Sequence, residues 1–433
     1  MIAVFMAVLP TATLDVKLLA RAGLHHYGPY SLLMLFIYCL DNRCAPSPET
    51  ALPISSLFPF VYFMVRDFHI AKSDQDIGFY AGYVGSSFMF GRALTSVFCG
   101  MVADKYGRKP VIMIGTVSVV VLNTLFGLST NFWMAVATRF LLGSANGLLG
   151  PMKAYAVEVC RKEHQAIGMS IVSTSWGIGL IIGPALGGFL AQPAEKYPKI
   201  FSQNSLFGKF PYFLPCFCIS LFAVFATISC LWLPETLHKH NELQKDAHDS
   251  SEDIEASSSS AGLKEYIQES EEKEASSNES LLKNWPLMSS IIVYCIFSLH
   301  NMAYSEIFSL WAVSNREYGG LSFSTQDVGQ VLAVSGFGLL NVLSVSITTG
   351  LLLLQNNAVE QHQRGAANGI SMTAMSLAKA AGPAGGGTLF AWAQKRQEAF
   401  FLPEDHMVFF VLNLVEFLGI VFTFKALQAL PKK

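Results

Sequence analysis

Long apolar stretches separated by short polar turns make up most of this chain. Most are close to the ~20 residues with which an α-helix crosses a bilayer. They lack the ~10-residue segments of alternating polarity that are typical of membrane barrels. Because backbone N–H and C=O groups in lipid must be paired within helices, the pattern predicts an all-α polytopic membrane protein. The predicted spans lie at 50–66, 78–102, 110–129, 132–153, 168–192, 211–233, 285–312, 328–355, 366–392 and 406–429.

One polar segment divides these spans into two groups. Residues 234–284 are rich in Ser, Glu, Lys and Asp, a composition that cannot bury a core, so we expect a disordered linker there. It separates an N-terminal six-helix bundle at 50–233 from a C-terminal bundle at 285–433. Residues 1–49 form an N-terminal segment of uncertain order.

Composition supports a membrane protein and excludes several functions. The chain of 433 residues is 52% hydrophobic and 14% charged, against about 25% charged in a typical soluble domain. Its net charge of −2 gives no sign of nucleic-acid binding, and it contains no phosphate-binding loop and no nucleophile constellation, so we expect neither an ATP-driven pump nor an enzyme. The eight cysteines lie mostly in apolar segments without zinc spacing, so we predict no metal site and no cofactor.

The basic residues give the orientation. Lys105, Arg108 and Lys109 gather in the loop after the second span, with more basic residues in the loop at 159–165. By the positive-inside rule these loops and the linker are cytoplasmic. The loop at 193–210 also carries lysines, including Lys196, so the bias is incomplete.

The loop between the second and third spans has the spacing Gly-x-x-x-Asp-x-x-Gly-Arg-Lys. It resembles the loop between helices two and three of the major facilitator superfamily, and the resemblance implies a two-bundle transporter fold. It also implies a conformational latch on the cytoplasmic side, with the start of the span at 366 as its partner. The alternative is that the charges only anchor the loop in water. The latch residues are Gly100, Asp104, Gly107, Arg108 and Lys109.

A glycine–proline segment occurs twice, 199 residues apart, and such parallel repeats occur in the two halves of major facilitators. Small residues let helices approach closely, and proline permits a kink. The first copy resembles a fifth-helix motif of antiporters and implies a hinge or a seal; plain tight packing is the alternative. The residues are Gly179, Gly183, Pro184 and Gly187, with Gly382 and Pro383 in the second copy.

Longer stretches resemble the plant zinc-induced facilitator-like branch of this superfamily. Examples are Leu52-Pro53-Ile-Ser-Ser-Leu-Phe-Pro59 and Gln363-Arg364-Gly365-Ala-Ala-Asn368-Gly369. The resemblance implies proton-coupled secondary transport at the vacuolar or plasma membrane. The implied substrates are zinc-related small solutes, such as zinc, a metal chelator, an organic acid or a cation. The expected partners are a small-molecule or ion substrate, protons and the lipid bilayer.

Polar residues inside spans are candidates for proton coupling or substrate binding, because charge in a membrane is costly and faces partners or water. Arg139 resembles the family's fourth-helix arginine, linked there to proton coupling; snorkelling to the interface is the alternative. In the seventh span His300, Asn301, Tyr304 and Glu306 form a candidate proton or substrate cluster, or else a set of buried hydrogen bonds. Weaker candidates are Arg92, Lys153, Glu158, Lys379 and Glu416.

The two halves are unequal, with six predicted spans in the first and four in the second. The family leads us to expect six in each, so we infer a missing helix pair with a join near 337–341, from alternative splicing or a gene-model error. This leaves a second hypothesis open. The chain would then be a truncated, non-transporting form that regulates or assembles with a full-length homologous transporter.

Overall fold

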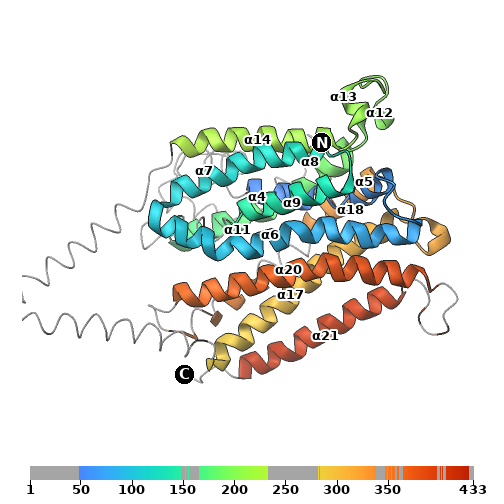
Figure 1. The fold of residues 1–433 in the computed structure, drawn as a ribbon. Helices are drawn as coiled ribbons and strands as arrows, with labels where there is room; N and C mark the ends of the chain where they lie inside the picture. Colours follow the sequence, from blue (N-terminus) through green and yellow to red (C-terminus); the bar gives the residue numbers. More distant parts are fainter. Residues whose placement is uncertain are drawn as a thin grey trace, which may run out of the picture.

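The computed structural model describes residues 48–147, 165–232, 283–337, 364–396 and 406–428, with isolated positions between these ranges. Every regular element in these residues is helical, and the long helices run roughly along one common direction (Figure 1). The α-helices are α4 (Pro48–Ser55), α5 (Val61–Asp67), α6 (Ile77–Tyr106), α7 (Arg108–Ser118), α8 (Thr124–Gly127), α9 (Phe132–Ala145), α11 (Gln165–Leu190), α12 (Pro193–Lys196), α13 (Leu206–Lys209), α14 (Phe213–Leu231), α17 (Trp285–Val313), α18 (Thr325–Phe337), α20 (Arg364–Gln394) and α21 (His406–Gln428). The short turns are η1 (Asp74–Asp76), the π-helical η2 (Val119–Asn123) and η4 (Arg316–Tyr318).

The first predicted span is not one helix. The structure divides 50–66 into α4 and α5, with a buried turn at 56–60 between them. Pro59 lies in that turn and has no N–H to continue a helical hydrogen-bond pattern. The predicted spans at 78–102, 168–192, 211–233, 285–312, 366–392 and 406–429 each correspond to a single helix, and 110–129 corresponds to α7, η2 and α8 in direct succession. The predicted spans at 132–153 and 328–355 begin with α9 and α18, and parts of both lie outside the described residues.

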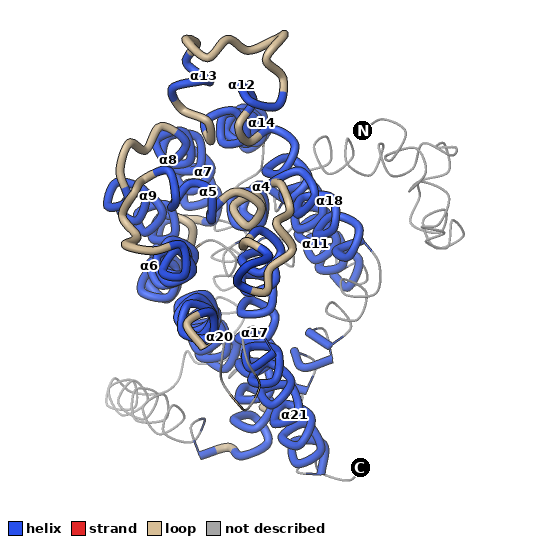
Figure 2. Tube along the Cα trace, turned by 90° about the vertical axis from the view of Figure 1, so that its right-hand side faces the viewer, coloured by secondary structure: helices blue, strands red, loops and turns tan. Residues whose placement is uncertain are grey.

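The helices form two groups that meet along two seams. Viewed down the helix axes, α20 lies beside α6, and α18 lies beside α11 (Figure 2). Within the first group α6 packs on α9, α11 packs on α4, and α14 packs on α7, η2 and α8. Within the second group α17 packs on both α20 and α21. We call α6–α20 and α11–α18 the two inter-bundle seams.

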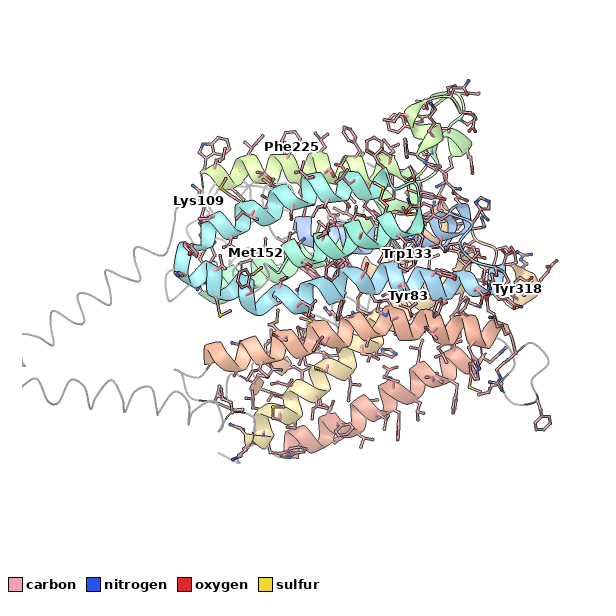
Figure 3. The ribbon with its side chains drawn as sticks, in the orientation of Figure 1. Tyr83, Lys109, Trp133, Met152, Phe225 and Tyr318 are labelled. Carbon is pink, nitrogen blue, oxygen red and sulfur yellow. The ribbon has the colours of Figure 1, made fainter. Side chains whose placement is uncertain are left out.

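The molecule has two ends along the helix axes. The linker end is where α6 and α14 finish and α17 begins, and the far end is where α6 and α18 begin. Lys109 lies at the linker end and Tyr318 at the far end (Figure 3). The residues at 1–47 and 233–280 and the join at 338–346 lie outside the described residues.

The most apolar long helices are those that do not form the seams. Among the described residues four helical segments are long and apolar enough to cross a membrane: 108–127, 213–231, 285–313 and 406–424. The helices α6 and α20 are as long, but glycine, serine and charged residues lower their apolarity. Several of the glycines pack against the neighbouring helix, which fits the position of both helices at a seam.

The second half is shorter than the first between its seam helices. The sequence Ser73-Asp-Gln75-Asp76-Ile-Gly78 opens α6, and Ser324-Thr-Gln326-Asp327-Val-Gly329 opens α18, an offset of 251 residues. The glycine–proline repeat in α11 and α20 has an offset of 199. The second half is therefore 52 residues shorter in this interval, about the length of two spans with their connections.

The shortening leaves α21 with fewer neighbours than α14. In the described residues α14 is covered by α7, η2 and α8, whereas α21 packs mainly on α17. Only 11% of the apolar stretch at 406–424 is buried, against 39% for α14. The helix that should cover α21, by analogy with α7 and α8, has no counterpart in the described part of the second half.

Candidate functional site

The α6–α20 seam is closed by glycine near the far end. A Cβ atom at Gly82 would lie 2.4 Å from the carbonyl oxygen of Pro383, and one at Gly387 would lie 2.3 Å from that of Gly78. Real Cβ atoms do not approach backbone so closely, so only glycine permits this contact between the two helices. The predicted hinge or packing residue Pro383 thus lies directly at the seam, while Gly382 faces Leu299 and Met302 of α17.

The α11–α18 seam is built in the same way. A Cβ at Gly329 would lie 2.7 Å from the carbonyl oxygen of Pro184 and 2.7 Å from Cα of Gly188. The other predicted glycines serve contacts inside the first bundle. Gly183 and Gly187 lie against Ser55 and Ser56, and the Ser55 hydroxyl donates to the Gly179 carbonyl at 3.0 Å.

A lysine–carboxylate pair lies at the far end of the α6–α20 seam. Lys395 Nζ lies 2.5 Å from an oxygen of Asp76 at the start of α6. The Ser73 hydroxyl donates to the other oxygen of Asp76 at 2.8 Å. The hydrogen bond from Lys395, followed by that from Ser73, lowers the pKa of Asp76 below its usual value.

A related contact lies at the far end of the α11–α18 seam. Lys196 donates to the Thr325 hydroxyl and to the Gly188 carbonyl, and it also interacts electrostatically with Asp327. Burial lowers the pKa of Lys196 to about 8, while Glu195 and Asp327 act in the opposite direction. Lys196 is an exception to the positive-inside rule, because it lies at the far end. Its hydrogen bonds at the α11–α18 seam explain why a lysine is found there.

The two far-end contacts are related by the internal repeat. Lys196 and Lys395 are 199 residues apart, the same offset as the glycine–proline segments, and Asp76 and Asp327 occupy matching places in their repeat. We call Asp76–Lys395 and Thr325/Asp327–Lys196 the far-end contacts. Sequence reasoning missed them, although the repeated Ser-x-Gln-Asp-x-Gly segment is a signal that could have found them.

Glu306 and Arg139 are two buried charges, one in each bundle, that interact electrostatically. The Glu306 side chain, on α17, is fully buried, and among the described residues neither carboxyl oxygen has a hydrogen-bond partner. A Cβ at Gly85 of α6 would lie 3.1 Å from Glu306 Oε2, so this carboxyl group points at the first bundle. Both side chains are buried, and the charge of Arg139 on α9 favours the negative form of Glu306.

Arg139 is held inside the first bundle rather than at the interface with water. It is 1% exposed and donates from Nη1 to the Pro53 carbonyl at 2.7 Å. Its guanidinium lies over the rings of Phe126 and Phe88, at 4.6 and 5.7 Å from the centroids. This placement does not match the snorkelling alternative.

The remaining members of the predicted cluster face elsewhere on α17. His300 stacks on Tyr304, and its Nε2 lies 3.8 Å from Glu416 of α21. The Asn301 carbonyl accepts from the Ser305 hydroxyl at 2.9 Å. Glu306 lies two residues beyond Tyr304, about 200° around a helix, so the structure separates it from the histidine–tyrosine pair.

The loop with the superfamily spacing lies at the linker end. Gly107 joins α6 to α7 with φ of 106°, a backbone conformation that favours glycine. Lys109 Nζ donates to the Leu231 carbonyl at the end of α14, at 2.8 Å, which ties the loop to its own bundle. Arg108 is half-buried and a Cβ at Gly100 would meet nothing within 4 Å. The side chains of Asp104 and of the first residues of α20 lie outside the described ones.

The described residues contain no candidate metal site. No group of three or more His, Cys, Asp or Glu side chains in that part of the chain lies close enough to hold an ion.

Known proteins resemble this chain over most of its length. The Major Facilitator Superfamily model matches residues 33–354. Protein ZINC INDUCED FACILITATOR 1 of Arabidopsis thaliana is 57% identical over 434 aligned residues, covering 87% of this chain and 89% of that protein. Protein ZINC INDUCED FACILITATOR-LIKE 1 of the same plant is 56% identical over 436, covering 88% and 89%.

Solved structures share the fold at low sequence identity. A D-xylose-proton symporter has a TM-score of 0.59 at 11% identity, covering 93% of this chain and 98% of its own. A bacterial homolog of the human lysosomal transporter Spinster has a TM-score of 0.61 at 11% identity, covering 93% and 98%.

The aligned length also exceeds the number of residues of this chain that it covers. Because 87% of 433 residues is about 377, about 57 of the 434 positions aligned with the first relative have no residue of this chain opposite them. This number is close to the 52 residues by which the two repeat intervals differ. The family match, the two relatives and the two-seam helical fold together show that the chain belongs to the major facilitator superfamily, in its zinc-induced facilitator-like branch, as a membrane transporter and not an enzyme.

Proposed function

We propose that this chain is a proton-coupled secondary active transporter that works by alternating access. Its solute belongs to the zinc-related class of metal chelators, organic acids or cations, and its membrane is the vacuolar or the plasma membrane. The observation that carries the proton coupling is Glu306, a fully buried carboxyl group at the bundle interface without a hydrogen-bond partner in the described residues.

Glu306 can couple a proton to the movement of the bundles. It projects from α17 toward α6 of the other bundle, and Arg139 is the cation that its negative form attracts. A buried carboxylate is costly unless it is paired, so protonation changes the attraction between the bundles. A proton that binds one arrangement better than the other shifts the equilibrium between them.

The seams support a closed far end. By the positive-inside rule the linker end faces the cytoplasm, so the glycine contacts and the far-end contacts seal the extracytoplasmic side. In this proposal the described arrangement is the one closed away from the cytoplasm, and opening requires both far-end contacts to break.

The test is uptake into liposomes that contain the purified chain, driven by a proton gradient, with zinc, a zinc–chelator complex, an organic acid and potassium offered in turn. Glu306→Gln removes the titrating group while keeping its size. We expect gradient-driven accumulation to fall about tenfold or more, because without a titrating carboxyl group the proton gradient no longer shifts the equilibrium between the two arrangements. Solute exchange without a gradient should remain.

Glu317→Gln is the matched control, because Glu317 is an exposed glutamate in η4, outside the candidate cluster on α17. Its gradient-driven uptake should equal that of the wild type. Unchanged accumulation by Glu306→Gln would remove Glu306 as the proton carrier.

The second candidate function is a non-transporting form that assembles with a full-length homologue. The sparse burial of α21 and the 52-residue shortening favour it. It predicts no flux for any of the four solutes, together with co-purification of the chain with a full-length relative when both are expressed. Flux by the chain alone would exclude it.

A further inference from the structure

Arg92 is a second buried arginine that the proposed proton coupling does not use. It is the sixteenth of the thirty residues of α6, so it lies at the middle of that helix. It is 3% exposed. It follows Gly85 by seven residues, two helical turns, and so continues the face of α6 that meets the second bundle. It therefore lies just on the linker side of the glycine contacts.

The two buried arginines differ in their partners. Arg139 has the Pro53 carbonyl, two aromatic rings and the charge of Glu306. Among the described residues Arg92 has no carboxylate and no hydrogen-bond acceptor. Its one close partner is the ring of Trp176, 5.9 Å from the guanidinium carbon.

The surroundings of Arg92 come from both bundles. Trp176 belongs to α11 and packs in the same cluster as Met302 of α17 and Ala380 of α20. Tyr294 of α17 is buried and interacts electrostatically with Arg92. Solute sites of such transporters lie near the midplane between the repeats, which is where these side chains meet.

A buried guanidinium without a counter-charge is costly, and bound anions remove that cost. A carboxylate matches the planar fork of arginine with two parallel hydrogen bonds, and a tyrosine hydroxyl can donate a third. A cation is repelled at the same place. We propose that Arg92, with Tyr294 and Trp176, binds the carboxylate of a small organic anion carried between the bundles.

This inference rests on the proposed transport function and narrows its solute to an anion. It does not depend on Glu306. The experiment therefore measures binding in detergent, without a membrane or a proton gradient. Trp176 is the reporter, because an anion on Arg92 would lie beside its indole ring and change its fluorescence.

The probes are benzoate, benzylamine and benzyl alcohol, which share a ring and differ in charge, and inorganic phosphate. We expect benzoate to change the fluorescence saturably, and the other three to bind at least tenfold more weakly. Trp176→Phe should abolish the signal. Direct binding of radiolabelled benzoate is measured in that variant as well, so that loss of the reporter is not counted as loss of binding.

Arg92→Gln should weaken benzoate binding about tenfold or more, since hydrogen bonds to a charged group are the stronger kind. Arg92→Lys keeps the charge and should recover part of the affinity, which controls for misfolding of the glutamine variant. Arg66→Gln is the matched control, because Arg66 is exposed at the end of α5 and should leave binding unchanged.

Equal binding of benzylamine or phosphate, or unchanged benzoate binding in Arg92→Gln, would overturn the anion subsite. Glu306→Gln separates the two proposals. If it loses gradient-driven uptake while benzoate still binds equally to wild type and Arg92→Gln, only the subsite is wrong. If benzoate binding depends on Arg92 while no variant affects gradient-driven uptake, only the proton coupling is wrong.

Discussion

At the residue scale, environment decides what identical side chains do. Lys196 and Lys395 occupy matching positions in the repeat, yet Lys395 is half-exposed in an ion pair whereas Lys196 is partly buried against α18. An exposed ion pair contributes only about 0–1 kcal/mol, so Lys395 alone is a weak contact. Burial instead gives Lys196 a pKa of about 8, which makes its contact sensitive to pH.

The sign of that sensitivity follows from linkage. In the closed arrangement the pKa of Lys196 is about 8, below its usual 10.5, because burial disfavours the charge. A released Lys196 in water would bind the proton more tightly, so lowering the pH from about 10.5 to about 8 favours release. Below that range both forms are protonated and the equilibrium no longer depends on this group.

Pulsed electron paramagnetic resonance can test this by measuring the distance between spin labels at positions 200 and 317, which both lie at the far end. The distance between them should shift toward longer values as pH falls from 10.5 to 8 and stay constant from 8 to 6. In Lys196→Met, which carries no charge, the dependence should vanish. A shift confined to the range below pH 7 would contradict the assignment to Lys196.

At the element scale, glycine spacing decides which helices can touch. α20 carries Gly387 toward α6 and Gly385 away from it, although the two lie on the same turn. A Cβ at Gly387 would lie 3.0 Å from Cα of Gly82 as well as against the Gly78 carbonyl, whereas one at Gly385 would meet nothing within 4 Å. The pair therefore separates helix–helix contact from the effect of glycine on the helix itself.

Gly387→Ala should force α6 and α20 apart at the far end and lower the free energy of unfolding by about 1–3 kcal/mol, the usual cost of overpacking. Gly385→Ala should be neutral or stabilising by up to about 1 kcal/mol, because alanine favours a helix over glycine. Thermal unfolding in detergent compares the two variants. An equal loss of stability in both would show that the seam does not depend on the missing Cβ.

At the scale of the whole molecule, the repeat closes the far end twice. The two seams lie on different helix pairs, and each ends in a lysine with its own partner. Contacts that share no partner usually add within ~0.3–0.5 kcal/mol. Opening the far end should therefore respond to both contacts independently.

A cysteine at position 302 tests this, because Met302 packs against Gly382, beside the contact between Gly82 and Pro383. In a background without native cysteines, an impermeant maleimide applied from the far end should label Met302→Cys slowly. Lys395→Met and Lys196→Met should each raise the rate modestly, by less than about fivefold for the exposed Lys395 pair. The double variant should give the product of the two effects. A double variant no faster than either single one would show a single gate.

The prediction from sequence was strongest where the solvent is lipid. The bounds of α14, α17, α20 and α21 follow the apolar runs closely, because lipid leaves a spanning segment little choice but a helix. The sequence missed the break at 56–60, since apolarity does not reveal a turn that another helix covers. It also grouped His300 with Glu306, because closeness in sequence does not determine which helix each side chain will face.

The sequence by itself determined the family, the helical fold and the shortened second half, since apolar length, loop motif and repeat spacing are local or countable along the chain. Only the tertiary structure decided which polar residues meet. Glu306 with Arg139, Arg92 with Trp176, and the two far-end contacts each join helices far apart in sequence. Their closeness depends on how the two bundles pack, which no local pattern contains.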